Sequence, residues 1–195
     1  TGKGERLTIC AGRANLDEFA DVHHISLSAG DCRWVRREPA GRPPRSRSGH
    51  TAVHVPGKGT VLFGGLSSDK GFLSDCSLLT DEGWEPVCAM GELACGRDKH
   101  SAVLVPTSAM DSEGAAGWRM IVFGGFGIMP PPEEEDEEDN DGADKPSAAA
   151  EEADPRGRAL ELGWFDDAYA IDCETFYSAR LRSSQPKEAR PEARA

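Results

Sequence analysis

The hydrophobic residues of this chain fall in short runs, and in many of these runs apolar and polar positions alternate. Residues 50–56 read His-Thr-Ala-Val-His-Val-Pro, which places Thr51, Val53 and Val55 on one face of an extended chain. β-Branched and aromatic residues are frequent within the runs, and Gly, Pro, Asp and Ser separate them. This pattern predicts an all-β fold with almost no helix. The predicted strands cover residues 6–12, 19–27, 33–38, 50–56, 59–65, 74–80, 84–90, 100–106, 118–126, 165–172 and 175–181.

The runs also repeat along the chain. RLTICAG at 6–12, TVLFGG at 60–65 and MIVFGG at 120–125 each end in two small residues. Each is followed by a mixed acidic and apolar segment, namely FADVHHISL at 19–27, LSDCSLLT at 73–80 and FDDAYAID at 165–172. A His-Ser/Thr-Ala-Val segment precedes the second and third copies. A repeat of about 50 residues built from short strands is typical of a β-propeller blade.

These copies resemble the kelch family of β-propeller repeats. The family pattern has an Arg before Gly-His or Ser-Ala, a diglycine that closes the second strand, an Asp in the third strand and a Trp that opens the fourth. In the third copy Phe176 or Tyr177 stands where the family has Trp. The matching positions are Asp21 and Trp34 in the first copy, Arg47, His50, Gly64, Gly65, Asp75 and Trp84 in the second, and Arg97, His100, Gly124, Gly125 and Asp167 in the third.

The resemblance implies a chain made of kelch-type propeller blades. We expect a partial repeat 1 over residues 1–49, repeat 2 over 50–96, repeat 3 over 97–182 and a disordered tail over 183–195. Propellers close with about four to eight blades, so three blades form an incomplete ring. Further sequence, a second copy of the chain or another protein would have to complete it.

The motif residues have a structural interpretation. Paired glycines allow positive φ angles and close approach of a neighbouring sheet, and a Trp can pack between two blades. A carboxylate next to a turn, such as that of Asp75, can accept hydrogen bonds from backbone N–H groups. We therefore expect these residues to hold the blades together, rather than to carry catalysis.

Charge is concentrated in one segment. The whole chain carries a net charge of −12, and residues 130–155 alone contain twelve acidic residues and one lysine. Like charges combined with Pro and Ala cannot bury enough apolar surface to offset chain entropy, so we expect a disordered acidic insert at 130–160 within repeat 3. The insert is a candidate docking segment for a basic partner, or a solubilising spacer.

A basic segment lies between the first and second copies. Its arginines could bind phosphate or an acidic partner peptide, could contact the acidic insert, or could simply be solvated charges on a strand and a loop between blades. Ser46 and Ser48, each next to an arginine, are candidate phosphorylation sites. The arginines are Arg33, Arg36, Arg37, Arg42, Arg45 and Arg47.

We expect no metal, cofactor or catalytic centre in these residues. His50 and His100 occupy the same repeat position, and His23 and His24 are neighbours on a strand, so they face opposite sides. A calcium-loop alignment on Gly142 fails because Ala148 stands where a bidentate Glu is needed. Nucleophile-elbow and phosphate-loop motifs do not occur. The scattered cysteines indicate reduced thiols and a cytoplasmic or nuclear protein, and no apolar run is long enough to cross a membrane.

Kelch propellers generally present loops to partner proteins, so the resemblance implies a non-catalytic protein-interaction scaffold within a larger multidomain or oligomeric protein. Nucleic acid is not an expected partner, whereas self-association could close the ring. An alternative comes from AGRANLDEFADVHHISL at 11–27 and VLFGGLSSDKGFLSDCSLL at 61–79. These segments resemble the kelch part of the methyltransferases that complete wybutosine in tRNA, which implies an accessory propeller of a multidomain enzyme.

Overall fold

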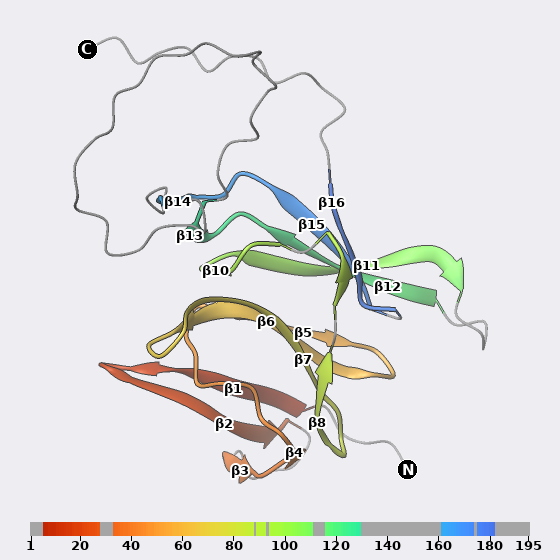
Figure 1. Ribbon diagram of the computed structural model, residues 1–195. Helices are drawn as coiled ribbons and strands as arrows, with labels where there is room; N and C mark the ends of the chain where they lie inside the picture. The colour runs from red at the N-terminus through yellow and green to blue at the C-terminus, as the bar shows by residue number, and fades with distance from the viewer. Residues whose placement is uncertain are drawn as a thin grey trace, which may run out of the picture.

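The computed structural model describes residues 6–27, 33–87, 89–92, 94–110, 116–129, 161–173 and 175–181. All regular elements in these residues are strands (Figure 1). The predicted acidic insert at 130–160 and the predicted tail at 183–195 lie outside the described residues. The strands are β1 (Arg6–Ala14), β2 (Asp17–Ser26), β3 (Val35–Arg37), β4 (Ala40–Gly41), β5 (Thr51–Val55), β6 (Gly59–Ser67), β7 (Gly71–Leu79), β8 (Gly83–Val87), β9 (Met90–Gly91), β10 (Arg97–Asp98), β11 (Ser101–Met110), β12 (Ala116–Phe123), β13 (Phe126–Ile128), β14 (Leu162–Trp164), β15 (Ala168–Asp172) and β16 (Tyr177–Arg180).

The described strands form open sheets, which confirms the predicted all-β class. The first sheet has the order β1-β2-β3, the second sheet β4-β8-β7-β6-β5, and the third sheet β11-β12-β15-β16-β9. A smaller sheet, β10-β13-β14, lies beside the third. In Figure 1 the second sheet lies between the first sheet below it and the third sheet above it.

The second and third sheets have the same plan. Each is an antiparallel meander of four strands, extended by a two-residue strand that pairs in parallel with the last strand of the meander. In the second sheet Gly41 lies opposite Trp84, and in the third sheet Gly91 lies opposite Ser178. The first sheet contains counterparts of the last three meander strands, since β1-β2-β3 corresponds to β6-β7-β8.

The strand register defines which residues are equivalent in the three sheets. Cys10, Phe63 and Phe123 each stand directly before the two small residues, and they lie opposite Val22, Cys76 and Ala168. Counting from these pairs makes Ile9, Leu62 and Val122 equivalent, and likewise Thr8, Val61 and Ile121. This equivalence allows the packing of one sheet to be compared with that of the next.

The hydrophobic core lies at the two boundaries between neighbouring sheets. We call the boundary between the first and second sheets the first seam, and that between the second and third sheets the second seam. The first seam contains a small cluster of Val22, Leu62, Leu79 and Trp84, with Cys10 packed against it. The second seam contains the larger cluster of Val55, Val61, Phe63, Cys76, Leu78, Ala94, Met120, Val122, Tyr169, Ile171 and Cys173.

The diglycine ends a strand in only one of the two complete sheets. Gly124 and Gly125 follow β12 as predicted, but β6 continues past Gly64 and Gly65 to Ser67. The strand can continue because a register shift between Phe63 and Gly65 accommodates the positive φ angles of the two glycines, 64° and 102°. The short strands β4, β10 and β14 lie outside the predicted ranges, since two or three residues carry no readable alternation.

Candidate functional site

In the second sheet, the motif arginine is the centre of a polar cluster. Arg47 has no exposed side-chain surface, and its Nη1 and Nη2 donate to Asp75 Oδ1 and Oδ2 at 2.7 and 2.8 Å. Nη1 also donates to Gly64 O at 2.9 Å, and Nε donates to Arg45 O at 3.0 Å. The guanidinium thus ties the start of β5 to β6 and β7 within one sheet.

The third sheet repeats this cluster with equivalent residues. Arg97 Nη1 donates to Asp167 Oδ1 at 2.5 Å and to Gly124 O at 2.9 Å, and Nε donates to Cys95 O at 3.1 Å. Asp167 is 9% exposed, whereas its counterpart Asp75 is 48% exposed. The Arg97 side chain, on β10 of the smaller sheet, also lies over the Phe165 ring, with Cζ 4.0 Å from the centroid.

These contacts change the expected role of the motif aspartates. Asp75 and Asp167 were expected to accept backbone N–H groups at turns, but each binds a buried guanidinium instead. A buried arginine needs such a partner because an unpaired charge away from water is costly. In the first sheet Asp21 contacts His23 Nε2 at 2.9 Å.

The motif histidines lie at the boundaries between sheets. His100 is buried, and its Nε2 lies 2.8 Å from Thr51 Oγ1 of the second sheet. Its ring packs edge-on against Phe63, with the centroids 5.2 Å apart. Burial lowers the pKa of His100 to about 4, and the positive charge of Arg97 acts in the same direction. Burial also lowers the pKa of His50, with a contribution from Arg47.

The motif tryptophan positions differ among the sheets. Trp84 is buried in the first seam, between the first and second sheets. Trp34 is 48% exposed, because the described residues place no sheet against its face of the first sheet. The prediction of Phe176 or Tyr177 at the Trp position of the third copy is wrong in register. Ser178 lies opposite Ile171 and Gly91, as Trp84 lies opposite Leu79 and Gly41.

A cavity of about 620 Å³ opens at the first seam, between the first sheet and the turns of the second. We call it the basic cavity. Among the described residues, the lining contains three cations and one carboxylate, and Leu79 is its one large apolar side chain. The lining residues are Arg6, Thr8, His24, Ser26, Arg37, His54, Gly57, Lys58, Gly59, Thr60, Leu79, Thr80 and Asp81.

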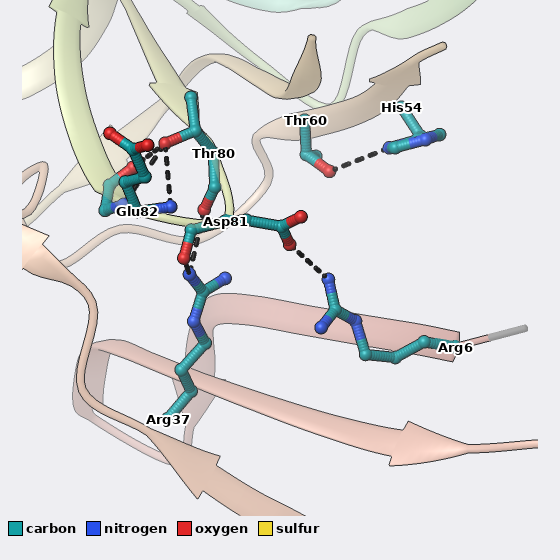
Figure 2. A network of polar contacts seen from close by, with 8 residues as sticks. Arg6, Arg37, His54, Thr60, Thr80, Asp81 and Glu82 are labelled. Atoms are coloured by element: carbon teal, nitrogen blue, oxygen red, sulfur yellow. Dashed lines mark hydrogen bonds and ion pairs between the residues drawn. The ribbon is translucent and has the colours of Figure 1, made fainter. Parts of the chain in front are cut away.

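Two arginines of the first sheet point toward the turn between β7 and β8 at this cavity (Figure 2). Arg37 Nη2 donates to Thr80 O at 2.9 Å and also to Asp81 O. Arg6 Nη2 forms an ion pair with Asp81 Oδ1 at 3.1 Å. These contacts fix both guanidinium groups at the cavity wall. The described lining residues still carry more positive than negative charges.

The cavity exists because the first seam is polar where the second seam is apolar. Thr8 and His24 lie opposite each other in the first sheet, at the positions equivalent to Val61 and Leu78 in the second. Val61 and Leu78 are buried in the second-seam core. His24 Nδ1 is shielded from solvent and has no hydrogen-bond partner among the described residues.

The basic segment of the sequence does not form one patch. Arg47 is buried, Arg37 reaches the basic cavity, and Arg45 pairs with Asp69 at 2.8 Å on the surface. Arg6, the other arginine in the described lining of the cavity, lies on β1 and is not part of that segment. Ser48 Oγ donates to Glu18 Oε1 at 3.4 Å, so a phosphate on Ser48 would meet a carboxylate.

Among the described residues, no group of three or more His, Cys, Asp or Glu side chains is placed to hold a metal ion. Among the described residues, Cys10, Cys76 and Cys95 are free thiols. Burial raises the pKa of Cys76 to about 12 and that of Cys10 to about 11. No helix in the described parts of the chain is long and apolar enough to cross a membrane.

Comparison with known proteins gives a limited likeness. No family model matches the chain. Over 75 residues it is 33% identical to the acyl-CoA-binding domain-containing protein 5 of Arabidopsis thaliana. The matched residues make up 37% of this chain and 11% of that protein, so the chain spans a small part of the length of this relative.

Proposed function

We propose that the three sheets are kelch-type propeller blades and that they act as a non-catalytic scaffold for protein binding. Two features support the blade interpretation. The second and third sheets have the same strand order. At each of them a buried arginine donates hydrogen bonds to an aspartate carboxylate and to the carbonyl oxygen of the first glycine of the diglycine. The motif residues then hold each blade together, which leaves binding to the surfaces and turns between blades.

One observation carries the binding proposal, and it is the difference between the two seams. If the blades served only to stack, the first seam would gain from an apolar pair like Val61 and Leu78. It has Thr8 and His24 instead, and an open cavity beside them. These polar residues stand where the second seam has buried apolar residues, so the first seam loses the stability that apolar burial would give. Such a loss indicates that the position is kept for a ligand.

The charge of the cavity indicates the class of ligand. In the part of the chain that the structure describes, Arg6, Arg37 and Lys58 outnumber the carboxylate of Asp81 in the lining, and hydroxyl groups occupy much of the rest. Such a surface suits carboxylate groups, and electrostatic complementarity selects partners and speeds their association. The partner segment that we propose is an acidic peptide, since the cavity is open and lies next to the turns β5–β6 and β7–β8.

Titration of a fluorescein-labelled peptide of alternating Asp and Glu, followed by anisotropy, tests this function. The scaffold should bind the peptide, and binding should weaken with added salt. The double variant Thr8→Val/His24→Leu copies the second seam into the first, so it should fold stably and lose binding. Lys58→Glu should weaken binding about tenfold or more, equivalent to about 1.4 kcal/mol. Lys70→Glu makes the same charge change on an exposed turn outside the cavity and should bind normally.

Absence of peptide binding by the folded chain, or equal binding by the double variant, would refute the acidic-ligand proposal. The accessory propeller of a wybutosine-synthesising methyltransferase stays a prediction from sequence, as do the cytoplasmic or nuclear location and a basic partner for the acidic insert. The relative from Arabidopsis is named for an acyl-CoA-binding domain. We do not extend that binding to this chain, because the match covers 11% of the relative.

A further inference from the structure

The two outer sheets each present an apolar face with no neighbouring sheet among the described residues. On the first sheet, Leu7, Ile9 and Trp34 are 50%, 51% and 48% exposed. On the third sheet, Val103 and Phe123 are 57% and 56% exposed. These faces are the lower and upper ends of the stack in Figure 1.

The exposed residues of the first sheet are equivalent to buried residues of the other sheets. Ile9 is equivalent to Leu62, which is 1% exposed, and to Val122, which is 0% exposed. Trp34 takes the place of Trp84, which is 4% exposed. In the second and third sheets, this face packs against the preceding sheet. The Ile9 face is therefore built to receive a sheet from that side.

The exposed residues of the third sheet have buried counterparts too, on the opposite face of the sheet. Phe123 is equivalent to Phe63, which is 2% exposed and packs against the following sheet in the second seam. Val103 lies opposite Ile121, as Val53 lies opposite Val61, and Val53 packs against the same core. The Phe123 face is therefore the side of a sheet that accepts the next one.

We infer that a second copy of this chain covers these faces, with the Phe123 face of each copy against the Ile9 face of the other. This arrangement continues the sheet-to-sheet packing that the chain already uses twice internally. It rests on the proposed propeller architecture, because two copies then form one closed ring within the range of propeller sizes. Two equivalent junctions related by a twofold axis join the copies, so the dimer is closed and its interface is isologous.

Light scattering after size exclusion, over a range of protein concentrations, tests the pairing. The wild-type chain should have twice the mass of its 20.9 kDa monomer. Phe123→Asp and Ile9→Asp should each give a monomer with an unchanged β-sheet circular dichroism spectrum. Leu16→Asp should remain a dimer, because Leu16 is 91% exposed and lies in the turn between β1 and β2.

Mixing the two monomeric variants gives the decisive comparison. Pairing of unlike faces at each junction predicts that Phe123→Asp and Ile9→Asp chains together form a dimer, since one junction then joins two unaltered faces. A wild-type monomer at about 100 µM, far above a typical micromolar Kd, would overturn the proposal, and so would a mass that grows without limit. Peptide titration of the monomeric variants keeps the two proposals separate, because the basic cavity lies within one chain.

Discussion

Arg97 and Asp167 form the more buried of two equivalent ion pairs. Both pairs contain an arginine with no exposed side-chain surface, but Asp167 is 9% exposed and Asp75 is 48% exposed. Water can therefore solvate the carboxylate of the second sheet, whereas that of the third sheet depends on its guanidinium partner. The same Arg–Asp pair should therefore contribute differently to the free energy of unfolding at the two positions.

Substitution of the two aspartates should reveal this difference. Asp167→Asn leaves a buried guanidinium without its counter-charge and should lower the free energy of unfolding by about 3 kcal/mol. Asp75→Asn should cost only about 1 kcal/mol, because solvent screens the pair. Urea denaturation followed by circular dichroism measures both values. Equal losses for the two variants would contradict the role given to burial.

The first glycines of the two diglycines form a second matched pair. Gly64 and Gly124 have nearly the same φ, 64° and 65°, so a change to alanine at either should cost about 1 kcal/mol from backbone strain. A Cβ on Gly64 would also lie 2.9 Å from His100 Cε1 and from Arg97 O. Among the described residues, a Cβ on Gly124 would come within 4 Å of Phe165 O alone, at 3.5 Å.

We therefore expect Gly64→Ala to destabilise the protein by about 1 to 3 kcal/mol more than Gly124→Ala, as overpacking does. Thermal or urea unfolding of the two variants gives the comparison. If Gly124→Ala were the more harmful change, the close approach of the third sheet to Gly64 would not be the cause of the glycine requirement.

Titration of His100 should make stability depend on pH. The pKa of this residue is 6.5 ordinarily and about 4 in the folded protein, so the unfolded chain binds the proton more tightly. Stability contributed by the neutral imidazole is then complete above about pH 7 and is lost as the pH falls from 7 toward 4. Between pH 7 and pH 5 the loss should be about 2 kcal/mol. His50 contributes in the same direction.

The variant His100→Gln checks this assignment. It should be less stable than the wild type at pH 7, because the contacts with Thr51 and Phe63 are changed. Its free energy of unfolding should also fall less steeply between pH 7 and pH 5. An unchanged slope would show that other groups account for the acid sensitivity.

The sequence predicts local structure well where alternation and repetition coincide. The strands around Val53, Phe63 and Val122 lie where the sequence patterns predicted them, because each has at least one face in a core. The register of the third copy was harder to predict. Ser178 occupies the Trp position, and its pairings with Ile171 and with Gly91, which is far away in the sequence, identify it.

The candidate site could be predicted only in part. Arg37 belongs to the basic segment that the sequence indicates as a candidate site, but Arg6 and Lys58 join it from separate strands and turns. Nothing local in the sequence brings these cations together, since the register of β1 against β2 and the packing of two sheets decide it. The Arg47–Asp75 and Arg97–Asp167 pairs span 28 and 70 residues, so the sequence alone shows four motif positions and does not show that they pair.

Hydrogen–deuterium exchange of the wild-type chain, with and without the alternating Asp–Glu peptide, tests the central claim most directly. The claim is that the first seam is polar in order to bind an acidic segment. The peptide should slow exchange in residues 54–60 and 79–81, at the turns beside the basic cavity, and should leave the strands β11, β12 and β15 of the third sheet unchanged. Protection confined to residues outside the cavity, or no protection at a saturating peptide concentration, would contradict it.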